Sequence, residues 1–240
     1  MVRKPVGHGR PALPVTDLRD ILAAARVVLL DFDGPICSVF AGYPAPAVAD
    51  RLRNHLRDQG WHEDQLPQSD DPMVVWSEVT QRSVEAGRQI EPILRSAEIE
   101  AASTARPTPG AAELLTACRD THRPVAIVSN NTSEAIARYL ERDGLTDLVQ
   151  HVEGRDGSDP TFMKPNPRGL HRAIQALAVN PQGCVFVGDS ESDAMAACTA
   201  DVPFIGYANK PGKEPRLRDA GAQHVVTDLY PLALAMAGTR

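Results

Sequence analysis

Short apolar runs recur along the chain, and each is followed by polar or small residues. The first run, at 26–30, is continuous and rich in β-branched residues, which is the pattern of a strand buried on both faces. Similar runs follow at 123–130, 183–190, 202–208 and 222–228. These segments are predicted to be strands of one parallel sheet.

Helical patterns separate most of these predicted strands. Apolar residues recur at helical spacing in the stretches that begin at Pro109, Ser133, Asn166 and Ser192. A strand, a helix and a second strand in succession form the unit of parallel sheets, with a right-handed crossover. The alternation therefore predicts an α/β fold class with a doubly wound, Rossmann-like parallel sheet.

Residues 38–106 interrupt this alternation, because they contain helical patterns alone. Val48, Leu52 and Leu56 recur at intervals of four residues, which places them on one face of a helix. A later stretch around Ile90 repeats the pattern. The sequence therefore predicts an inserted all-α cap domain between the first strand and the rest of the sheet.

These patterns divide the chain into three parts. The segment 1–25, with its many Pro, Gly and Arg residues, is predicted to be a loose N-terminal arm. Residues 26–37 and 107–240 are predicted to form the α/β catalytic core, and 38–106 the helical cap. Short linkers are expected where the chain enters and leaves the cap.

Composition argues against several classes of partner and location. The chain has 240 residues and a formal net charge of −6, and its basic residues are scattered, so nucleic acid is not expected as a partner. Its longest strongly apolar run, AAARVVLL, is too short to span a bilayer, and the first residues contain no apolar core of a signal peptide. The four cysteines form no CxxC pair, which argues against a zinc site or a disulfide framework. A cytoplasmic protein with no membrane partner is expected.

The candidate chemistry lies where the predicted strands end. Ligands of open α/β sheets bind outside the carboxyl ends of the strands, so polar residues at those ends are expected to converge. One further candidate, a lysine, lies in the loop before a predicted helix. The candidates are Asp31, Asp33, Ser129, Asn130, Asn131, Lys164, Asp189 and Asp193.

Each candidate alone has a simpler interpretation, such as a surface carboxylate, a helix cap or a solvated lysine. Together they indicate chemistry. Asp31, Asp33 and Asp189 would repel one another in a partly desolvated crevice unless a divalent cation lay among them, and an oxygen-rich site suits Mg²⁺. Lys164 and Ser129 could then bind and neutralise the oxygens of a phosphate group. Phosphoryl transfer is the chemistry that this set serves.

Four motifs in this order resemble the haloacid dehalogenase-like superfamily of hydrolases. They are DFDG at 31–34, the strand end at Ser129, MKPNP around Lys164 and GDSESD at 188–193. The resemblance covers almost the whole chain from about Arg26. A phosphoglycolate phosphatase-like or β-phosphoglucomutase-like subgroup with a helical cap is nearest.

The resemblance implies roles for the carboxylates. Asp31 would attack phosphorus and become an aspartyl phosphate, and Asp33 would protonate the leaving group and later deprotonate water. Mg²⁺ would be held by Asp31, the backbone carbonyl of Asp33 and Asp189, with Asp193 as a further ligand or a contact through water. The namesake dehalogenases lack the second aspartate of the first motif, so Asp33 favours phosphate esters over halides.

The same resemblance assigns the phosphate site. Ser129 and Lys164 would hold the transferring phosphoryl group, and Asn130 would contribute. The first motif departs from the usual pattern of the family where Pro35 directly follows Gly34. Proline fixes φ and removes a backbone donor, so this departure bears on the motion of the cap more than on the chemistry.

The predicted function is that of a magnesium-dependent phosphatase, which hydrolyses a phosphate monoester of a small metabolite through an aspartyl-phosphate intermediate. A phosphomutase of the β-phosphoglucomutase type and a catalytically silent binding module are the alternatives. The expected partner is a small phosphorylated metabolite, and a homodimer is left open. Cys37 is interpreted as a buried structural thiol rather than a nucleophile. The cap offers Arg51, Arg53, Arg57, His62 and Arg82 as possible contacts to the leaving group, and most of these side chains are expected to be solvated face charges.

Overall fold

The computed structural model describes residues 17–157 and 159–239, and a six-stranded parallel sheet lies at its centre. The strands are β1 (Val27–Leu30), β4 (Val125–Thr132), β5 (His151–Arg155), β6 (Cys184–Gly188), β7 (Phe204–Tyr207) and β8 (His224–Val226). They lie in the order β5-β4-β1-β6-β7-β8, and every neighbouring pair is parallel. The predicted α/β, Rossmann-like fold class is therefore confirmed.

Helices cover both faces of this sheet. They are α1 (Leu18–Ala24), α5 (Ala111–Asp120), α6 (Ser133–Arg142), α7 (Arg168–Ala176), α8 (Glu191–Thr199), α9 (Lys213–Asp219) and α10 (Leu229–Gly238). Val28 and Leu30 of β1 pack into one core with α1, α5, α6 and α10, whereas Val27 and Leu29 pack into a second core with α7, α8 and α9. Because successive strand residues point to opposite faces, a strand covered on both sides must be apolar throughout, as this one is.

The predicted strands correspond to β1, β4, β6, β7 and β8, and the structure adds β5 at one edge of the sheet. The sequence of β5, HVEGR, contains no apolar run, and its first four residues are partly exposed. An edge strand is held by backbone hydrogen bonds on one side and does not have to be apolar, so hydrophobic periodicity does not reveal it.

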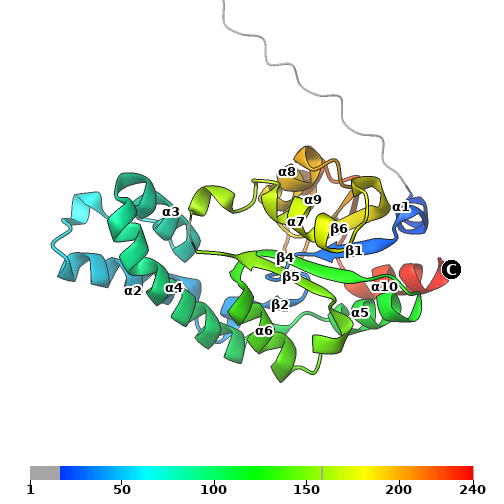
Figure 1. Cartoon of the computed structure of the whole chain (residues 1–240), viewed down its shortest axis with the longest axis horizontal. Helices are drawn as coiled ribbons and strands as arrows, with labels where there is room; N and C mark the ends of the chain where they lie inside the picture. Colours follow the sequence, from blue (N-terminus) through cyan, green and yellow to red (C-terminus); the bar gives the residue numbers. More distant parts are fainter. Residues whose placement is uncertain (1–16, 158, 240) are drawn as a thin grey trace, which may run out of the picture.

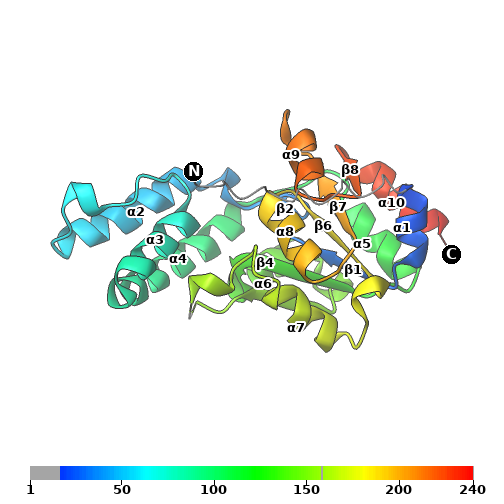
Figure 2. The same ribbon diagram turned by 90° about the horizontal axis from the view of Figure 1, so that it is seen from above.

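Residues between the first two long strands form a separate helical layer. The helices α2 (Ala45–Asp58), α3 (Pro72–Arg82) and α4 (Val84–Thr104) lie together at one end of the molecule, beyond the sheet (Figures 1 and 2). We call α2, α3 and α4 the helical unit. Its own core contains Leu52, Trp76, Ile90 and Leu94, all buried. The helical unit contributes no strand to the six-stranded sheet.

The chain crosses between the core and the helical unit at two adjacent points. The short strands β2 (Cys37–Ser38) and β3 (Arg106–Pro107) pair antiparallel there, which holds the two crossings side by side. A short 3₁₀ helix, Val39–Ala41, follows the first crossing. The division at 38 and 106 remains a proposal, and this pair of strands supports it.

The N-terminal arm requires a correction. Part of the segment assigned to a loose arm is the helix α1, which Asp17 caps by accepting a hydrogen bond from the Arg19 backbone N–H at 2.9 Å. Ile21 and Leu22 of this helix are buried in the core shared with α10. A helix of seven residues has two buried positions, too few for a clear periodic signal. Residues 1–16 lie outside the described part of the chain.

The helices of the described chain are too short or too polar to cross a membrane. Within 17–157 and 159–239, no helix combines the length and the apolar character that a bilayer requires. The longest, α4, has 21 residues and carries charged side chains along its length.

Candidate active site

The carboxyl ends of β1, β4 and β6 open onto one cleft with an empty volume of about 1060 Å³. Asp31 follows β1 directly, and Asp189 follows β6. Seven of the eight candidate residues line this cleft: Asp31, Asp33, Ser129, Asn130, Asn131, Lys164 and Asp189. The eighth, Asp193, lies in the first turn of α8 and is fully buried. The strand-end argument therefore places the candidates in one location.

Lys164 is the centre of a buried ion-pair network. Its Nζ lies 2.7 Å from Asp31 Oδ1 and 2.6 Å from Asp193 Oδ1, and it donates a hydrogen bond to the Val128 carbonyl at 3.1 Å. Together with Asp189, these three residues (Asp31, Lys164 and Asp193) form what we call the aspartate–lysine network. Asp193 Oδ1 has no donor other than the Lys164 ammonium among the described residues.

The network fits a small divalent cation. One carboxylate oxygen from each of Asp31, Asp189 and Asp193 lies within 4.8 Å of the other two. These are hard oxygen donors, as Mg²⁺ prefers, and among the described residues only the Lys164 ammonium contacts the buried Asp193 Oδ1 as a donor. The side chain of Asp33 is not part of this cluster, so any contribution of Asp33 would come from its backbone carbonyl.

Without a bound cation, burial and mutual repulsion disfavour the ionised carboxylates of the network. Burial raises the pKa of Asp31 to about 8, the nearby Asp193 carboxylate adds to the effect, and Lys164 opposes it. Burial alone would lower the pKa of Lys164, but the carboxylates of Asp193 and Asp31 outweigh burial and raise it. The lysine is therefore charged, and one lysine does not fully compensate the buried carboxylates.

Asp33 has a different environment, because it lies at the turn into the helical unit. Its Oδ1 accepts a hydrogen bond from the Val39 backbone N–H at 3.0 Å. Burial raises its pKa to about 6, although the Val39 hydrogen bond opposes the shift. Gly34 makes this turn with φ of 114°, and a Cβ there would lie 2.5 Å from Asp189 Cγ. The glycine lets the two aspartate loops pack against each other.

Two side chains that the sequence analysis missed contact Asp189. Asn209 Nδ2 donates a hydrogen bond to Asp189 Oδ2 at 2.9 Å, and Lys213 forms an ion pair with the same oxygen. Both follow β7, a strand that was predicted correctly. The same strand-end rule, applied to the residues after 208, would have found them.

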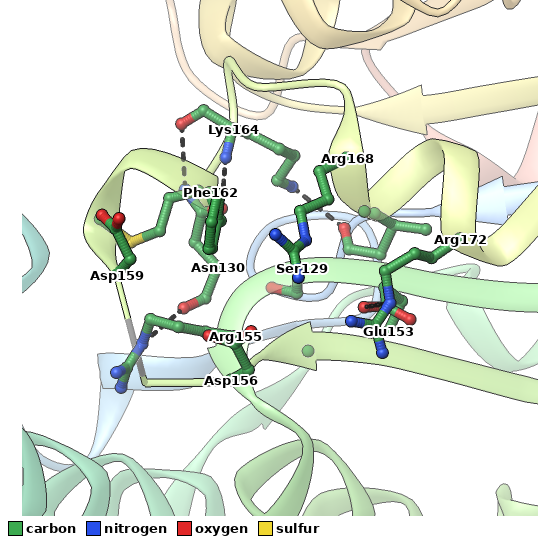
Figure 3. A pocket seen from close by; sticks show the side chains of 14 residues that line it. Ser129, Asn130, Glu153, Arg155, Asp156, Asp159, Phe162, Lys164, Arg168 and Arg172 are labelled. Atoms are coloured by element: carbon green, nitrogen blue, oxygen red, sulfur yellow. Dashed lines mark hydrogen bonds and ion pairs between the residues drawn. The ribbon is translucent and has the colours of Figure 1, made fainter.

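Asn130 has its side chain turned toward the Lys164 loop. Its Oδ1 accepts from the Lys164 backbone N–H at 2.8 Å, and its Nδ2 donates to the Lys164 carbonyl at 3.3 Å (Figure 3). Both ends of the amide are therefore used to hold the lysine loop. Ser129 Oγ accepts from the Asn131 backbone N–H at 3.2 Å and can donate to Asn131 Oδ1, 3.4 Å away.

The opposite wall of the cleft comes from the helical unit and its first crossing. None of the five possible cap contacts named from the sequence lines the cleft. Arg53, for example, is buried and bonds Asp50 and the Ser69 carbonyl, and Arg57 pairs with Glu63. The partners of both arginines lie within residues 50–69 and outside the cleft. The residues that do line the wall are Phe40, Ala45, Pro46, Asp70, Asp71, Pro72 and Met73.

Cys37 is a buried thiol, as expected. Burial raises its pKa far above the usual range, and the Asp33 carboxylate adds to the effect. A thiol that cannot ionise near neutral pH is a poor nucleophile.

Comparison with known proteins adds to this geometry. A family model described as a haloacid dehalogenase-like hydrolase matches residues 25–201. A phosphoglycolate phosphatase of Rhodobacter capsulatus is 36% identical over 107 residues, which are 45% of this chain and 47% of that protein. The chain spans 35–47% of the length of the first three curated relatives that it matches.

Solved structures agree on the fold. A hydrolase of the same family from Deinococcus radiodurans, with bound phosphate and sodium, is 25% identical and aligns with a TM-score of 0.58 over 90% of this chain and 98% of that one. A β-phosphoglucomutase from Clostridium difficile is 17% identical, with a TM-score of 0.64 over 87% of this chain and 93% of that one.

Proposed function

The chain belongs to the haloacid dehalogenase-like hydrolase family, and from this premise we propose that it is a magnesium-dependent phosphatase acting on a phosphate monoester of a small metabolite. The proposal includes an aspartyl-phosphate intermediate on Asp31. The observation that carries it is the aspartate–lysine network, in which one buried lysine contacts two aspartates and a third aspartate lies within ligand distance.

Asp31 is the proposed nucleophile, because it directly follows the central strand β1 and two contacts hold its Oδ1 in place. Its Oδ1 accepts from the Phe32 backbone N–H at 2.7 Å and pairs with Lys164. A nucleophilic carboxylate must be ionised, whereas burial raises the pKa of Asp31 to about 8. Asp31, Asp189, Asp193 and the Asp33 carbonyl would hold Mg²⁺, which supplies positive charge that favours the ionised carboxylate and the substrate phosphate.

Asp33 is the proposed general acid and base. A pKa of about 6 lies close to neutral pH, where one group can both donate and accept a proton. The Val39 backbone N–H fixes its Oδ1, so the carboxyl is held at the entrance to the helical unit. Asp33 would protonate the departing alkoxide and then remove a proton from the water that hydrolyses the phosphoenzyme.

Ser129 and Lys164 are the proposed phosphate ligands. Both line the cleft beside Asp31, one with a hydroxyl and the other with an ammonium group. A phosphoryl group between them and the carboxylates would find hydrogen-bond donors for its oxygens. Asn130 is proposed to act indirectly, since both ends of its amide bind the Lys164 backbone.

Phosphate release from a panel of phosphorylated metabolites in the presence of Mg²⁺ tests the proposal. We expect turnover that is lost with EDTA, restored by Mg²⁺ and absent in Asp31→Asn. Asp64→Asn, an exposed carboxylate of the helical segment outside the cleft, is the matched control and should leave turnover unchanged. Absence of any phosphate release from the panel, with the metal bound, would contradict the proposal.

A second measurement addresses the intermediate and the mutase alternative. Because Asp33 would activate water, Asp33→Asn incubated with acetyl phosphate should accumulate phosphate on the peptide that contains Asp31, detectable by mass spectrometry. A sugar bisphosphate supplied with a sugar monophosphate would reveal transfer instead of release, and transfer without hydrolysis would favour a mutase.

A further inference from the structure

A buried arginine joins the helical unit to the sheet. Arg155, the last residue of β5, has a side chain that is 2% exposed, and its two terminal nitrogens bind different carboxylates of α4. Nη2 lies 2.6 Å from Glu98 Oε2, and Nη1 lies 3.0 Å from Glu91 Oε1. The guanidinium also lies over the ring of Trp76 in α3, 4.7 Å from its centroid. We call Arg155, Glu91 and Glu98 the α4 joint.

The α4 joint also contacts residues 129–131, the last part of β4, where the pairing register with β5 shifts. We call this stretch, which carries the proposed phosphate site, the Ser129–Asn131 loop. Arg155 Nε donates to the Asn130 carbonyl at 3.1 Å (Figure 3), and Glu98 Oε1 accepts from Asn131 Nδ2 at 3.1 Å. Asn131 in turn holds the Ser129 hydroxyl through its backbone N–H. A continuous hydrogen-bonded path therefore runs from α4 to the hydroxyl that faces the cleft.

The α4 joint consists of charged side chains, which are not needed merely to hold two layers together. Two packed layers could be joined by apolar side chains at no cost in stability, because buried ion pairs lose about as much in desolvation as they gain in attraction. Here the Glu98 carboxylate is fully buried and divides its oxygens between the arginine and the loop. A hydrogen bond fixes the relative orientation of the two groups that it joins, which apolar contact does not. Here the hydrogen bond from Asn131 to Glu98 orients Asn131, whose backbone N–H binds the Ser129 hydroxyl.

We propose that Glu98 and Arg155 are positioning residues through which helix α4 holds the Ser129–Asn131 loop in the geometry that binds the phosphoryl group. The inference rests on the proposed function for the role of Ser129. It assigns α4 a part in phosphate binding although no residue of α4 lines the cleft.

Conservative variants test the proposal. Arg155→Lys keeps the charge but cannot bind two carboxylates and the Asn130 carbonyl together, and Glu98→Gln keeps the shape but presents an N–H₂ group to one of two donors. Asn131→Ala cuts the path on the loop side and leaves the arginine paired. The matched control is Glu134→Gln, which removes an ion pair of 2.6 Å between α4 and α6 that does not involve the loop.

The first measurement is inhibition by inorganic phosphate, competing with an alkyl phosphate. We expect the inhibition constant to rise about tenfold or more in the three joint and loop variants, since small displacements of binding groups cost that much. The midpoint for Mg²⁺ activation should stay within about twofold, because the metal ligands are untouched. Glu134→Gln should match the wild type. An unchanged inhibition constant in the folded Arg155→Lys and Glu98→Gln variants would overturn the proposal whatever Asn131→Ala shows, because Asn131 itself lines the cleft.

The second measurement needs no activity. Amide hydrogen exchange of the folded Glu98→Gln protein should be faster at 129–132 and unchanged in β7. If the wild type bound no phosphate and released none, the proposed function would fail, and the exchange data would still decide whether α4 orders the loop. Unchanged exchange at 129–132 would overturn the positioning role.

Discussion

The aspartate–lysine network and the α4 joint are built alike, since each buries a cationic side chain between two carboxylates, but their carboxylates are arranged differently. In the joint, Glu91 and Glu98 bind different nitrogens of Arg155, and Glu98 also accepts a hydrogen bond from Asn131. In the network, Asp31 and Asp193 both contact the single Nζ of Lys164, and an oxygen of Asp189 lies within 4.8 Å of an oxygen of each. The joint distributes its carboxylates around a planar guanidinium and is suited to fix structure, whereas the network gathers three carboxylates at one place and is suited to bind a cation.

The pKa values show the same contrast. Burial raises the pKa of both Asp31 and Glu98. For Glu98 the strongest opposing effects come from Arg155, whereas for Asp31 the carboxylates of Asp193 and Asp189 add to the shift. Removing a carboxylate should therefore relieve the network, whereas removing the arginine should damage the joint.

Asp31→Asn should give the largest effect on activity. The amide is nearly isosteric but cannot attack phosphorus, so kcat should fall at least about a thousandfold, as for other covalent catalysts that lose their nucleophile. The free energy of unfolding without Mg²⁺ should not decrease, because one repelling carboxylate is gone. Phosphate release and urea denaturation measure the two quantities. Activity within tenfold of the wild type would mean that another group is the nucleophile.

Arg155→Met should give the largest effect on stability. Two buried carboxylates of α4 would lose their shared partner, which typically costs about 3–5 kcal/mol in the free energy of unfolding. Urea denaturation measures the loss. Glu134→Gln removes a more exposed ion pair of the same helix and should cost less than about 1 kcal/mol. Equal losses in the two variants would remove the distinction between buried and exposed pairing.

The two clusters also differ in how far the sequence predicts them. Asp31 and Asp189 of the network follow strands with strong apolar runs, at ends that a parallel sheet brings together, so they could be identified from the sequence. Lys164 lies in a loop before a helix and was identified through the resemblance of MKPNP to a family motif. Arg155 ends a strand with no apolar run, and its carboxylate partners lie 57 and 64 positions away in the chain. No local pattern connects residues that only the packing of two layers brings into contact.

The wall formed by the helical unit was unpredictable for a related reason. Periodicity identified α2 and α4 as amphipathic, but it does not say which end of a helix faces the sheet. Arg53 shows the consequence, because it was one of the possible contacts to the leaving group and instead donates hydrogen bonds to the Pro67 and Ser69 carbonyls.

Asp33→Asn should give a smaller loss that depends on the substrate. An alkoxide leaving an alkyl phosphate needs a proton in the transition state, whereas the carboxylate leaving acetyl phosphate hardly does. We expect kcat/KM to fall roughly a hundredfold for the alkyl phosphate, the usual range for general acid catalysis, and clearly less for acetyl phosphate. Equal losses with the metal still bound would show that Asp33 serves position rather than proton transfer.

Asp70 and Asp71 represent a third situation, in which carboxylates line the cleft but are exposed and have no ion-pair partner among the described residues. They belong to an acidic segment. Eleven of the 31 acidic side chains but six of the 25 basic ones lie at 39–104, so this segment carries −5 of the formal net charge of −6. Lys164 is the one cationic residue in the lining, and it is committed to Asp31 and Asp193.

This wall should discriminate against substrates with an anionic leaving group, by a small factor because water and salt screen exposed charges. We expect Asp70→Asn with Asp71→Asn to raise kcat/KM several-fold for phosphoglycolate and much less for glycerol phosphate, whose leaving group is neutral. Asparagine also caps helices well, so α3 should be retained. A double variant of Asp58→Asn and Asp64→Asn changes the net charge equally outside the cleft and controls for long-range attraction. The gain for phosphoglycolate should shrink in high salt, and a gain equal for both substrates, or equal in the control, would show that the wall does not sense the charge of the leaving group.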